Sequence, residues 1–258
     1  MKKLLALTLA VLMVLSLAAC GPKEKEKTTV YAVEAGSAGE AVAKENGWEI
    51  NSVTSQADAL MEVKAGTSDA AIIDLLMAGA MIGEGTDYPN LTYTDKLTTE
   101  EYGVGCRKGS DLAAFINGVF AETYADGSLQ ALAETYGVQE SLLEQTSEVI
   151  EAPAGGDVAY IQGKGTLIVG ITDFEPMDYK DANGQWVGFD ADMARKVAEK
   201  LGVECEFIEI DWDNKIFELD SKSIDVVWNG MTLTDEVTSA MECTVPYCNN
   251  AQVVVVAK

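Results

Sequence analysis

The sequence contains no histidine among its 258 residues. This absence excludes Ser-His-Asp and Cys-His catalysis, proton shuttling by imidazole, and every zinc or haem site that needs a histidine ligand. Basic residues are also scarce, because 18 Lys and Arg stand against 42 Asp and Glu and give a formal charge of −24. Binding to nucleic acid requires clustered Lys and Arg that neutralise phosphates. The sequence therefore predicts no nucleic-acid partner.

Cysteine is infrequent and irregularly spaced. After Cys20, the chain has only Cys106, Cys205, Cys243 and Cys248, and their spacing fits no CxxC pair or zinc motif. We therefore predict no metal and no cofactor. Export would permit disulfides, so bridges and buried thiols both stay open, and we favour buried thiols.

The first 19 residues have the composition of an export signal. Lys2 and Lys3 precede an apolar run over residues 4–19, which is shorter than the ~20 residues needed to cross a bilayer core. The ending Leu-Ala-Ala-Cys resembles the lipobox of bacterial lipoproteins, which implies cleavage before Cys20 and lipid on its sulfur. Residues 20–27 would then form a charged, lipidated tether. An uncleaved membrane anchor is the alternative.

The rest of the chain alternates short β-branched runs with helical patterns, which is typical of α/β proteins. With 48% hydrophobic residues and this length, one large domain or two modest ones can form a core. The glycine-rich residues 152–165 read as a linker between two such blocks. We expect strands at 30–34, 70–73, 101–106, 167–171, 204–210, 224–228 and 252–256, and helices at 36–45, 56–64, 110–125, 129–136 and 189–201.

Several motifs resemble the polar amino-acid-binding proteins of ABC importers, known as solute-binding protein family 3. Residues 170–177 (GITDFEPM), 184–193 (GQWVGFDADM) and 224–236 (IDVVWNGMTLTDE) match the first half of that family. Residues 33–40 (VEAGSAGE), 66–74 (GTSDAAIID), 101–110 (EYGVGCRKGS) and 129–137 (LQALAETYG) match its second half, which here comes first. This order indicates a circular permutant, since domain termini often lie close together on the surface. Two joined gene fragments would give the same order.

The resemblance implies a two-lobed α/β fold of the periplasmic-binding-protein type II, or Venus flytrap, class in permuted order. The smaller lobe would hold residues 28–95 plus 247–258, and the larger lobe residues 96–246. Residues 152–165 would join the family's usual termini.

Candidate binding residues follow predicted strands, whose carboxyl ends face the ligand crevice in open α/β sheets. Asp74 matches the family's ammonium-binding aspartate, although a helix N-cap is the alternative. Asp173 and Phe174 match the side-chain pocket, with turn capping as the alternative for Asp173. Trp212 matches an aromatic residue that stacks on the ligand, with a core position as the alternative. The resemblance adds the contact residues Asn229, Gly230 and Thr232, and an anion site at a helix N-terminus formed by Ser37, Ala38 and Gly39.

One position departs from the family pattern. Val237 stands where family members usually carry an arginine that grips the ligand's α-carboxylate. Either another donor replaces it, or the ligand lacks an ordinary α-carboxylate. Arg107, expected in a surface turn, and Arg195, expected on a helix face, serve elsewhere. With Glu34 and Glu175 adding to the acidic groups, we predict a ligand with an amino group or positive charge.

The resemblance thus implies a lipid-anchored receptor on the extracytoplasmic face of the cell membrane. It would bind an amino acid or related small amine and deliver it to an ABC permease and its ATPase. A sensor for a signalling partner is an alternative. A dehydratase-like enzyme on the same fold is another, but we expect no enzyme and no catalytic residues.

Overall fold

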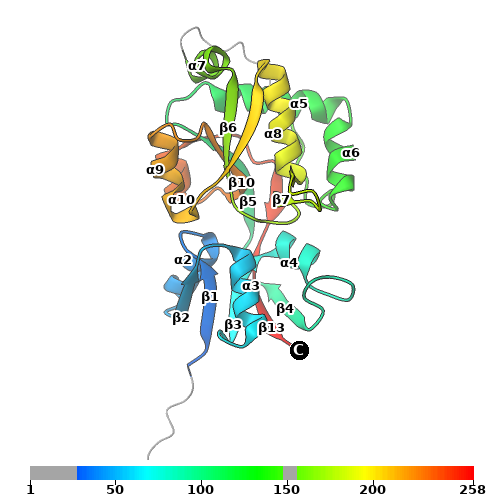
Figure 1. The fold of residues 1–258 in the computed structure, drawn as a ribbon, viewed down its shortest axis with the longest axis vertical. Helices are drawn as coiled ribbons and strands as arrows, with labels where there is room; N and C mark the ends of the chain where they lie inside the picture. The colour runs from blue at the N-terminus through cyan, green and yellow to red at the C-terminus, as the bar shows by residue number, and fades with distance from the viewer. Residues whose placement is uncertain (1–27, 148–155) are drawn as a thin grey trace, which may run out of the picture.

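The computed structural model describes residues 28–147 and 156–258, which form two lobes stacked along the long axis of the molecule (Figure 1). The expected signal peptide, the tether with Cys20, and residues 152–155 of the expected linker lie outside the described residues. In the described part of the chain, every helix is too short or too polar to cross a membrane.

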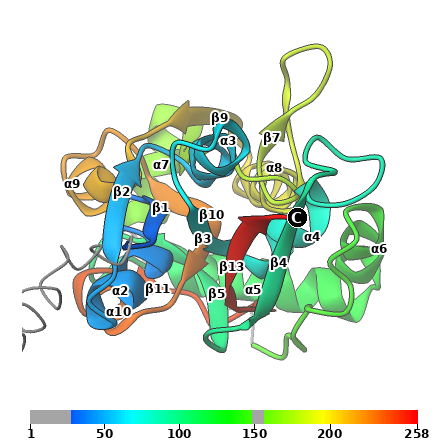
Figure 2. The ribbon, with the colours of Figure 1, turned by 90° about the horizontal axis from the view of Figure 1, so that it is seen from below.

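The smaller lobe is built on a five-stranded sheet in the order β2-β1-β3-β13-β4. Helices α2 and α3 cover opposite faces of this sheet (Figure 2). The consecutive β3 residues Ile72 and Ile73 accordingly pack into separate apolar clusters, one on each face. The elements of this lobe are β1 (Val30–Glu34), α2 (Ala38–Glu45), β2 (Glu49–Val53), α3 (Gln56–Ala65), β3 (Ala70–Asp74), α4 (Leu75–Met81), β4 (Leu91–Lys96) and β13 (Gln252–Ala257).

The larger lobe is built on a six-stranded sheet in the order β11-β5-β10-β6-β9, with β12 paired to β5. Its strands are β5 (Glu100–Cys106), β6 (Thr166–Ile171), β9 (Glu204–Glu209), β10 (Val226–Thr232), β11 (Glu242–Cys243) and β12 (Cys248–Asn250), and a hairpin of β7 (Tyr179–Lys180) and β8 (Trp186–Val187) stands apart. Its helices are α5 (Leu112–Ala125), α6 (Ser128–Thr135), α7 (Asp157–Lys164), α8 (Phe189–Leu201), α9 (Lys215–Asp220) and α10 (Asp235–Ala240). The two-lobed α/β class expected from the sequence is confirmed.

The chain passes between the lobes twice, through two adjacent segments. One runs from β4 to β5 and the other from β12 to β13. The N–H of Leu97 donates to the carbonyl of Gln252 (2.8 Å), and the N–H of Gln252 donates to Oγ1 of Thr98 (2.8 Å). We call this pair of hydrogen-bonded crossovers the hinge.

Three sequence expectations need correction. The glycine-rich linker contains α7, because Val158 and Ile161 are one helical turn apart and both are buried against the larger lobe. Residues Cys248–Asn250, assigned to the smaller lobe, pair with β5 of the larger lobe instead. Asn229, Gly230 and Thr232, expected after a strand, lie within β10, where the pairing register shifts.

The described cysteines are free thiols. Cys106 and Cys248 are buried, and Cys205 and Cys243 are half-buried. The alternative that we favoured from the sequence, thiols rather than bridges, is what the structure shows. Among the described residues, His, Cys, Asp and Glu side chains do not gather in any group of three or more that could hold a metal ion.

From the sequence we expected Arg107 in a surface turn. The structure shows instead that Arg107 is buried in the larger lobe. Its guanidinium forms ion pairs with Asp157 (3.0 Å) and Asp225 (3.3 Å). Arg195 pairs with Asp192 on α8 at 2.8 Å. Both arginines are therefore engaged within the larger lobe.

Candidate functional site

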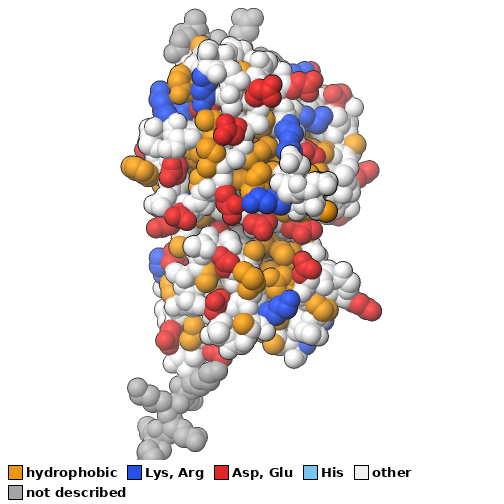
Figure 3. Space-filling model, in the orientation of Figure 1, with side chains coloured by type: hydrophobic (Ala, Val, Ile, Leu, Met, Phe, Trp, Pro, Cys, Tyr) orange, Lys and Arg blue, Asp and Glu red, His pale blue; other side chains and the backbone are white. Residues whose placement is uncertain are grey.

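A cleft of about 310 Å³ lies between the two lobes. The smaller lobe contributes the β1–α2 turn, the start of α3 and the end of β3, and the larger lobe contributes β10, α10 and the segment before α9. The lining residues are Glu34, Gly36, Ser37, Ala38, Ala41, Glu45, Gln56, Asp74, Phe174, Trp212, Lys215, Asn229, Gly230, Met231, Thr232, Thr234, Asp235, Glu236 and Val237. Figure 3 shows acidic side chains on both sides of the waist where the lobes meet.

Asp74 ends β3 at the floor of the cleft, and its side chain is only 4% exposed. Its Oδ1 accepts from the hydroxyl of Tyr102 (2.7 Å), from Nε2 of Gln252 (3.0 Å) and from Nδ2 of Asn250. Its Oδ2 accepts from Nε2 of Gln56. The side chain makes no cap bond to α4, so it does not serve as the helix cap that was the alternative. Asp74 instead joins the smaller lobe to Tyr102 in β5 of the larger lobe, and to Asn250 and Gln252, which flank the β12–β13 crossover of the hinge.

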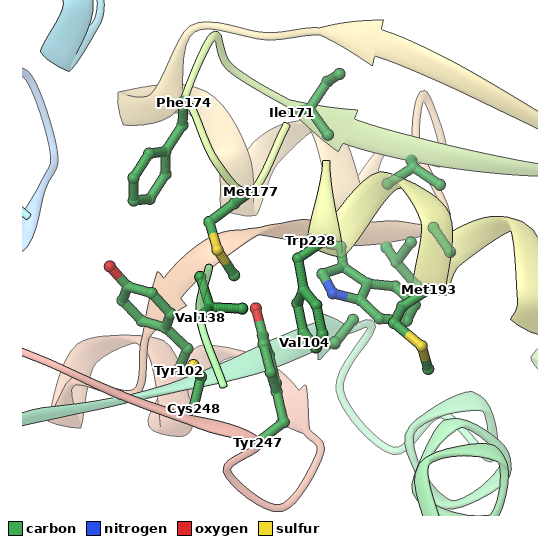
Figure 4. Close-up of a cluster of buried hydrophobic side chains, with 14 of the residues drawn as sticks. Tyr102, Val104, Val138, Ile171, Phe174, Met177, Met193, Trp228, Tyr247 and Cys248 are labelled. Carbon is green, nitrogen blue, oxygen red and sulfur yellow. The ribbon is translucent and has the colours of Figure 1, made fainter. Parts of the chain in front are cut away.

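Tyr102 shows how the larger lobe reaches this carboxylate. Its ring packs edge-on against Phe174, with ring centroids 6.3 Å apart, and belongs to the aromatic cluster shown in Figure 4. The hydroxyl points away from that cluster, toward Asp74. The buried ring of Tyr102 therefore holds its hydroxyl group at the floor of the cleft.

Glu34 is the second buried acid of the cleft. It ends β1, is 2% exposed, and its Oε1 has no hydrogen-bond partner among the described residues. The pKa of Glu34 is raised to about 8, mainly by burial and then by the Asp74 carboxylate, against the lowering effects of Lys215, Gln56 and Thr172. Burial, followed by the nearby Glu100, also raises the pKa of Asp74 to about 7. A cation that entered the cleft would favour the charged form of both acids.

The opposite wall of the cleft contains apolar side chains among polar and charged ones. Trp212 begins a single 3₁₀ turn, is 8% exposed and lines the cleft together with Phe174 and Val237. Trp212 also belongs to a buried apolar cluster with Leu219 and Val227, so the core position that was the alternative holds as well. Val237, where the resemblance led us to expect an arginine, lines the cleft with a side chain that has no hydrogen-bond donor.

The β10 residues of the cleft are held by internal hydrogen bonds. The Asn229 side chain exchanges hydrogen bonds with Thr172 and donates to Asp178 (2.8 Å). Gly230 has φ +54°, and a Cβ there would lie 2.4 Å from the ring of Phe174. Glycine at this position lets Phe174 sit against the strand and shape the wall.

The structure brings most of the predicted site residues into one cleft. Asp173 and Gly39 do not line it. Asp173 lines a separate hollow that includes Asp58 and Glu209, because it points to the other side of the segment that follows β6. Gly39 is buried, and a Cβ there would touch Gln252 and Ile72. The predicted residues that do line the cleft are Asp74, Trp212, Phe174, Asn229, Gly230, Thr232, Ser37 and Ala38.

Sequence reasoning missed Lys215, Gln56 and the hinge amides. Lys215 lies three residues after Trp212, and this spacing places two side chains on the same side of a helical turn. The spacing was the signal in the sequence that could have pointed to Lys215. Gln252 and Asn250 lie more than 170 positions from Asp74 along the chain, and no local pattern points to such a contact.

Comparison with known proteins connects this cleft to a family. Residues 167–258, from β6 to the end of the chain, match the family model of bacterial extracellular solute-binding proteins, family 3. The resemblance predicted from the sequence is thus confirmed over this part of the chain, which is related to that family.

The relatives carry amino-acid-binding names. The L-cystine-binding protein TcyJ of Escherichia coli (strain K12) is 35% identical over 88 residues, which are 34% of this chain and 33% of that protein. The arginine-binding extracellular protein ArtP of Bacillus subtilis (strain 168) is 41% identical over 75 residues, 29% of each chain. The chain spans about a third of the length of these curated relatives.

Solved structures give matches of similar extent. The arginine-bound form of truncated ArgBP from T. maritima is 42% identical, with a TM-score of 0.30, over 31% of this chain and 38% of that one. An ancestral cationic amino acid solute-binding protein is 42% identical, with a TM-score of 0.31, over 32% and 36% of the two chains.

Proposed function

We propose that this protein is an extracytoplasmic solute-binding receptor of an ABC importer. It captures an amino acid or related small amine between its lobes and delivers the solute to the permease and ATPase. The observation that carries the proposal is the cleft itself, where two buried acids, Glu34 and Asp74, face the apolar wall of Trp212 and Phe174. An ammonium group and methylenes are the chemistry that such a cleft accepts.

The hinge supports a capture mechanism based on closure. Two adjacent crossovers can absorb a rotation of one lobe against the other, and a solute that touches both lobes favours the closed state. Asp74 is bonded to Asn250 and Gln252, which flank the β12–β13 crossover, so a cationic group near it would act on the hinge as well as on the binding energy. Ligand recognition and closure are thereby coupled.

The permuted order and the membrane anchor belong to the same proposal. The segment matched to the family ends in β13, which pairs with β3 and β4, so residues 28–147 supply the strands that complete its lobe. Lipid on Cys20 would hold the receptor on the outer face of the cell membrane, beside its permease.

A solute screen tests the proposed function. We expect the full chain to bind at least one solute from a panel of proteinogenic amino acids, ornithine, cystine and small amines, as measured by isothermal titration and thermal shift. Small-angle scattering should show a smaller radius of gyration with that solute. No binding across the panel, or binding of dianionic solutes only, would contradict the proposal.

Replacing Trp212 by alanine tests the apolar wall. We expect Trp212→Ala to weaken binding of the tightest solute from the screen by roughly 10-fold or more, which corresponds to ~1.4 kcal/mol. Trp186→Ala is the matched control, because Trp186 lies on the β8 hairpin and outside the cleft. If the Trp212 variant and the wild type bound the solute with equal affinity, the Trp212 ring would not be part of the binding site.

A further inference from the structure

Lys215 is a buried cation in a cleft whose other charged groups are acidic. It begins α9 in the larger lobe and is 7% exposed. Among the described residues that line the cleft, Lys215 is the only Lys or Arg. The acids that line the same cleft are Glu34, Glu45, Asp74, Asp235 and Glu236.

The ammonium of Lys215 reaches across to the smaller lobe. Its Nζ donates to the carbonyl of Gly36 (2.8 Å) and to the carbonyl of Trp212 in its own lobe (3.2 Å). The lobes touch closely here, because a Cβ on Gly36 would lie 2.8 Å from the Cα of Asp213. An ammonium group has three N–H donors, and these two carbonyls accept two of them. The third donor has no hydrogen-bond acceptor among the described residues, and the ammonium lies over the Trp212 ring, 5.0 Å from its centroid.

Burial lowers the pKa of Lys215, while the nearby Glu236, Glu34, Asp213 and Glu40 favour its charged form, so Lys215 is a cation that suits the negative end of a solute. Gly36 immediately precedes Ser37, the N-cap of α2, so the ammonium lies close to the positive end of that helix. The unpartnered Oε1 of Glu34 lies in the same cleft on the smaller lobe and suits a positive end. The cleft thus offers a buried cation from one lobe and a buried acid from the other.

We propose that Lys215 binds the carboxylate of the solute, in the cleft whose arginine position is occupied by Val237, and that Glu34 receives its amino group. The solute class is then an amine that also carries a carboxylate, rather than a diamine or polyamine. This inference rests on the proposed function. It also assigns Lys215 a role in closure, since its contacts span both lobes.

Pairs of solutes that differ only in the carboxylate test this assignment. The probes are arginine with agmatine, ornithine with putrescine, lysine with cadaverine, and histidine with histamine. We expect the wild-type full chain to bind the amino acid of at least one pair roughly 10-fold or more tightly than its decarboxylated amine, as a charged hydrogen bond would give. In Lys215→Met, that preference should fall to within about threefold, whereas Lys215→Arg should retain most of it.

The ratio within a pair separates recognition from structure. If Lys215 served only closure or folding, Lys215→Met would weaken both members of a pair equally and leave their ratio unchanged, which would overturn the inference. A wild-type preference for the amine would overturn it as well. Lys200→Met is the matched control, because Lys200 pairs with Glu122 on the surface of the larger lobe. If no member of any pair binds the wild type, this inference fails, whereas the proposed function fails only if the whole panel of the solute screen gives no binding.

Discussion

Replacing Asp74 by alanine is expected to lower the free energy of unfolding by about 3 kcal/mol or more and to weaken solute binding roughly 10-fold or more. Two buried donors, the Tyr102 hydroxyl and Nε2 of Gln56, lose their acceptor in this variant, and each buried donor left unpaired costs about 1–3 kcal/mol. The amides of Asn250 and Gln252 also lose a bond to Asp74, but they keep Glu100 as an acceptor. Urea unfolding gives the stability change, and isothermal titration gives the affinity.

Asp220→Ala is the control for this variant, because Asp220 is exposed at the end of α9. Its stability and affinity should match those of the wild type. If Asp74→Ala were as stable as the wild type and bound the solute equally well, Asp74 would neither hold the hinge nor contribute to the site.

The second large effect is a loss of stability as pH rises. Glu34 has a pKa of about 8 in the folded protein against an ordinary value of 4.5. Between those values the unfolded chain has released the proton and the folded chain keeps it, so stability falls as pH increases. Because a tenfold change in proton affinity is worth about 1.4 kcal/mol, the shifted pKa of Glu34 alone accounts for on the order of 5 kcal/mol of this stability. The raised pKa of Asp74 also makes stability fall as pH increases, up to about pH 7.

Thermal unfolding of the solute-free protein between pH 5 and pH 8 measures this effect. We expect the melting temperature to fall across the range in the wild type and to fall less in Glu34→Gln, which removes the titrating group. Glu45→Gln, on the exposed end of α2, should keep the wild-type slope. A wild-type melting temperature that is constant or rises with pH would contradict the burial of an uncompensated acid in the cleft.

The alternation of short strands and helices was enough to predict the α/β class and most element positions. The helix α3 is an example, with Ser55 as N-cap and the left-handed Gly66 ending it, as glycine commonly does. The helix α7 was missed because the glycines around it are typical of a loop and its apolar face is short. A helix of eight residues depends on packing against a neighbour rather than on its own propensity.

The sequence predicted site residues by a simple rule: a polar or aromatic residue shortly after a predicted strand lies at the edge of the cleft. Asp74 and Trp212 follow this rule, and both line the cleft. Asp173 follows the same rule and lines a different hollow, because neighbouring positions in an extended segment point in opposite directions. The hydrogen bonds that Asp74 accepts from Tyr102, Asn250 and Gln252 depend on contacts between distant segments. So does the reach of Lys215 across the cleft.

A crystal structure of the full chain with its tightest solute tests the central claim most directly. The account predicts solute density enclosed between the lobes, in contact with Glu34 or Asp74 on one side and with Trp212 on the other. Density on an outer face, or a bound solute that touches only one lobe, would contradict capture by closure of the two lobes.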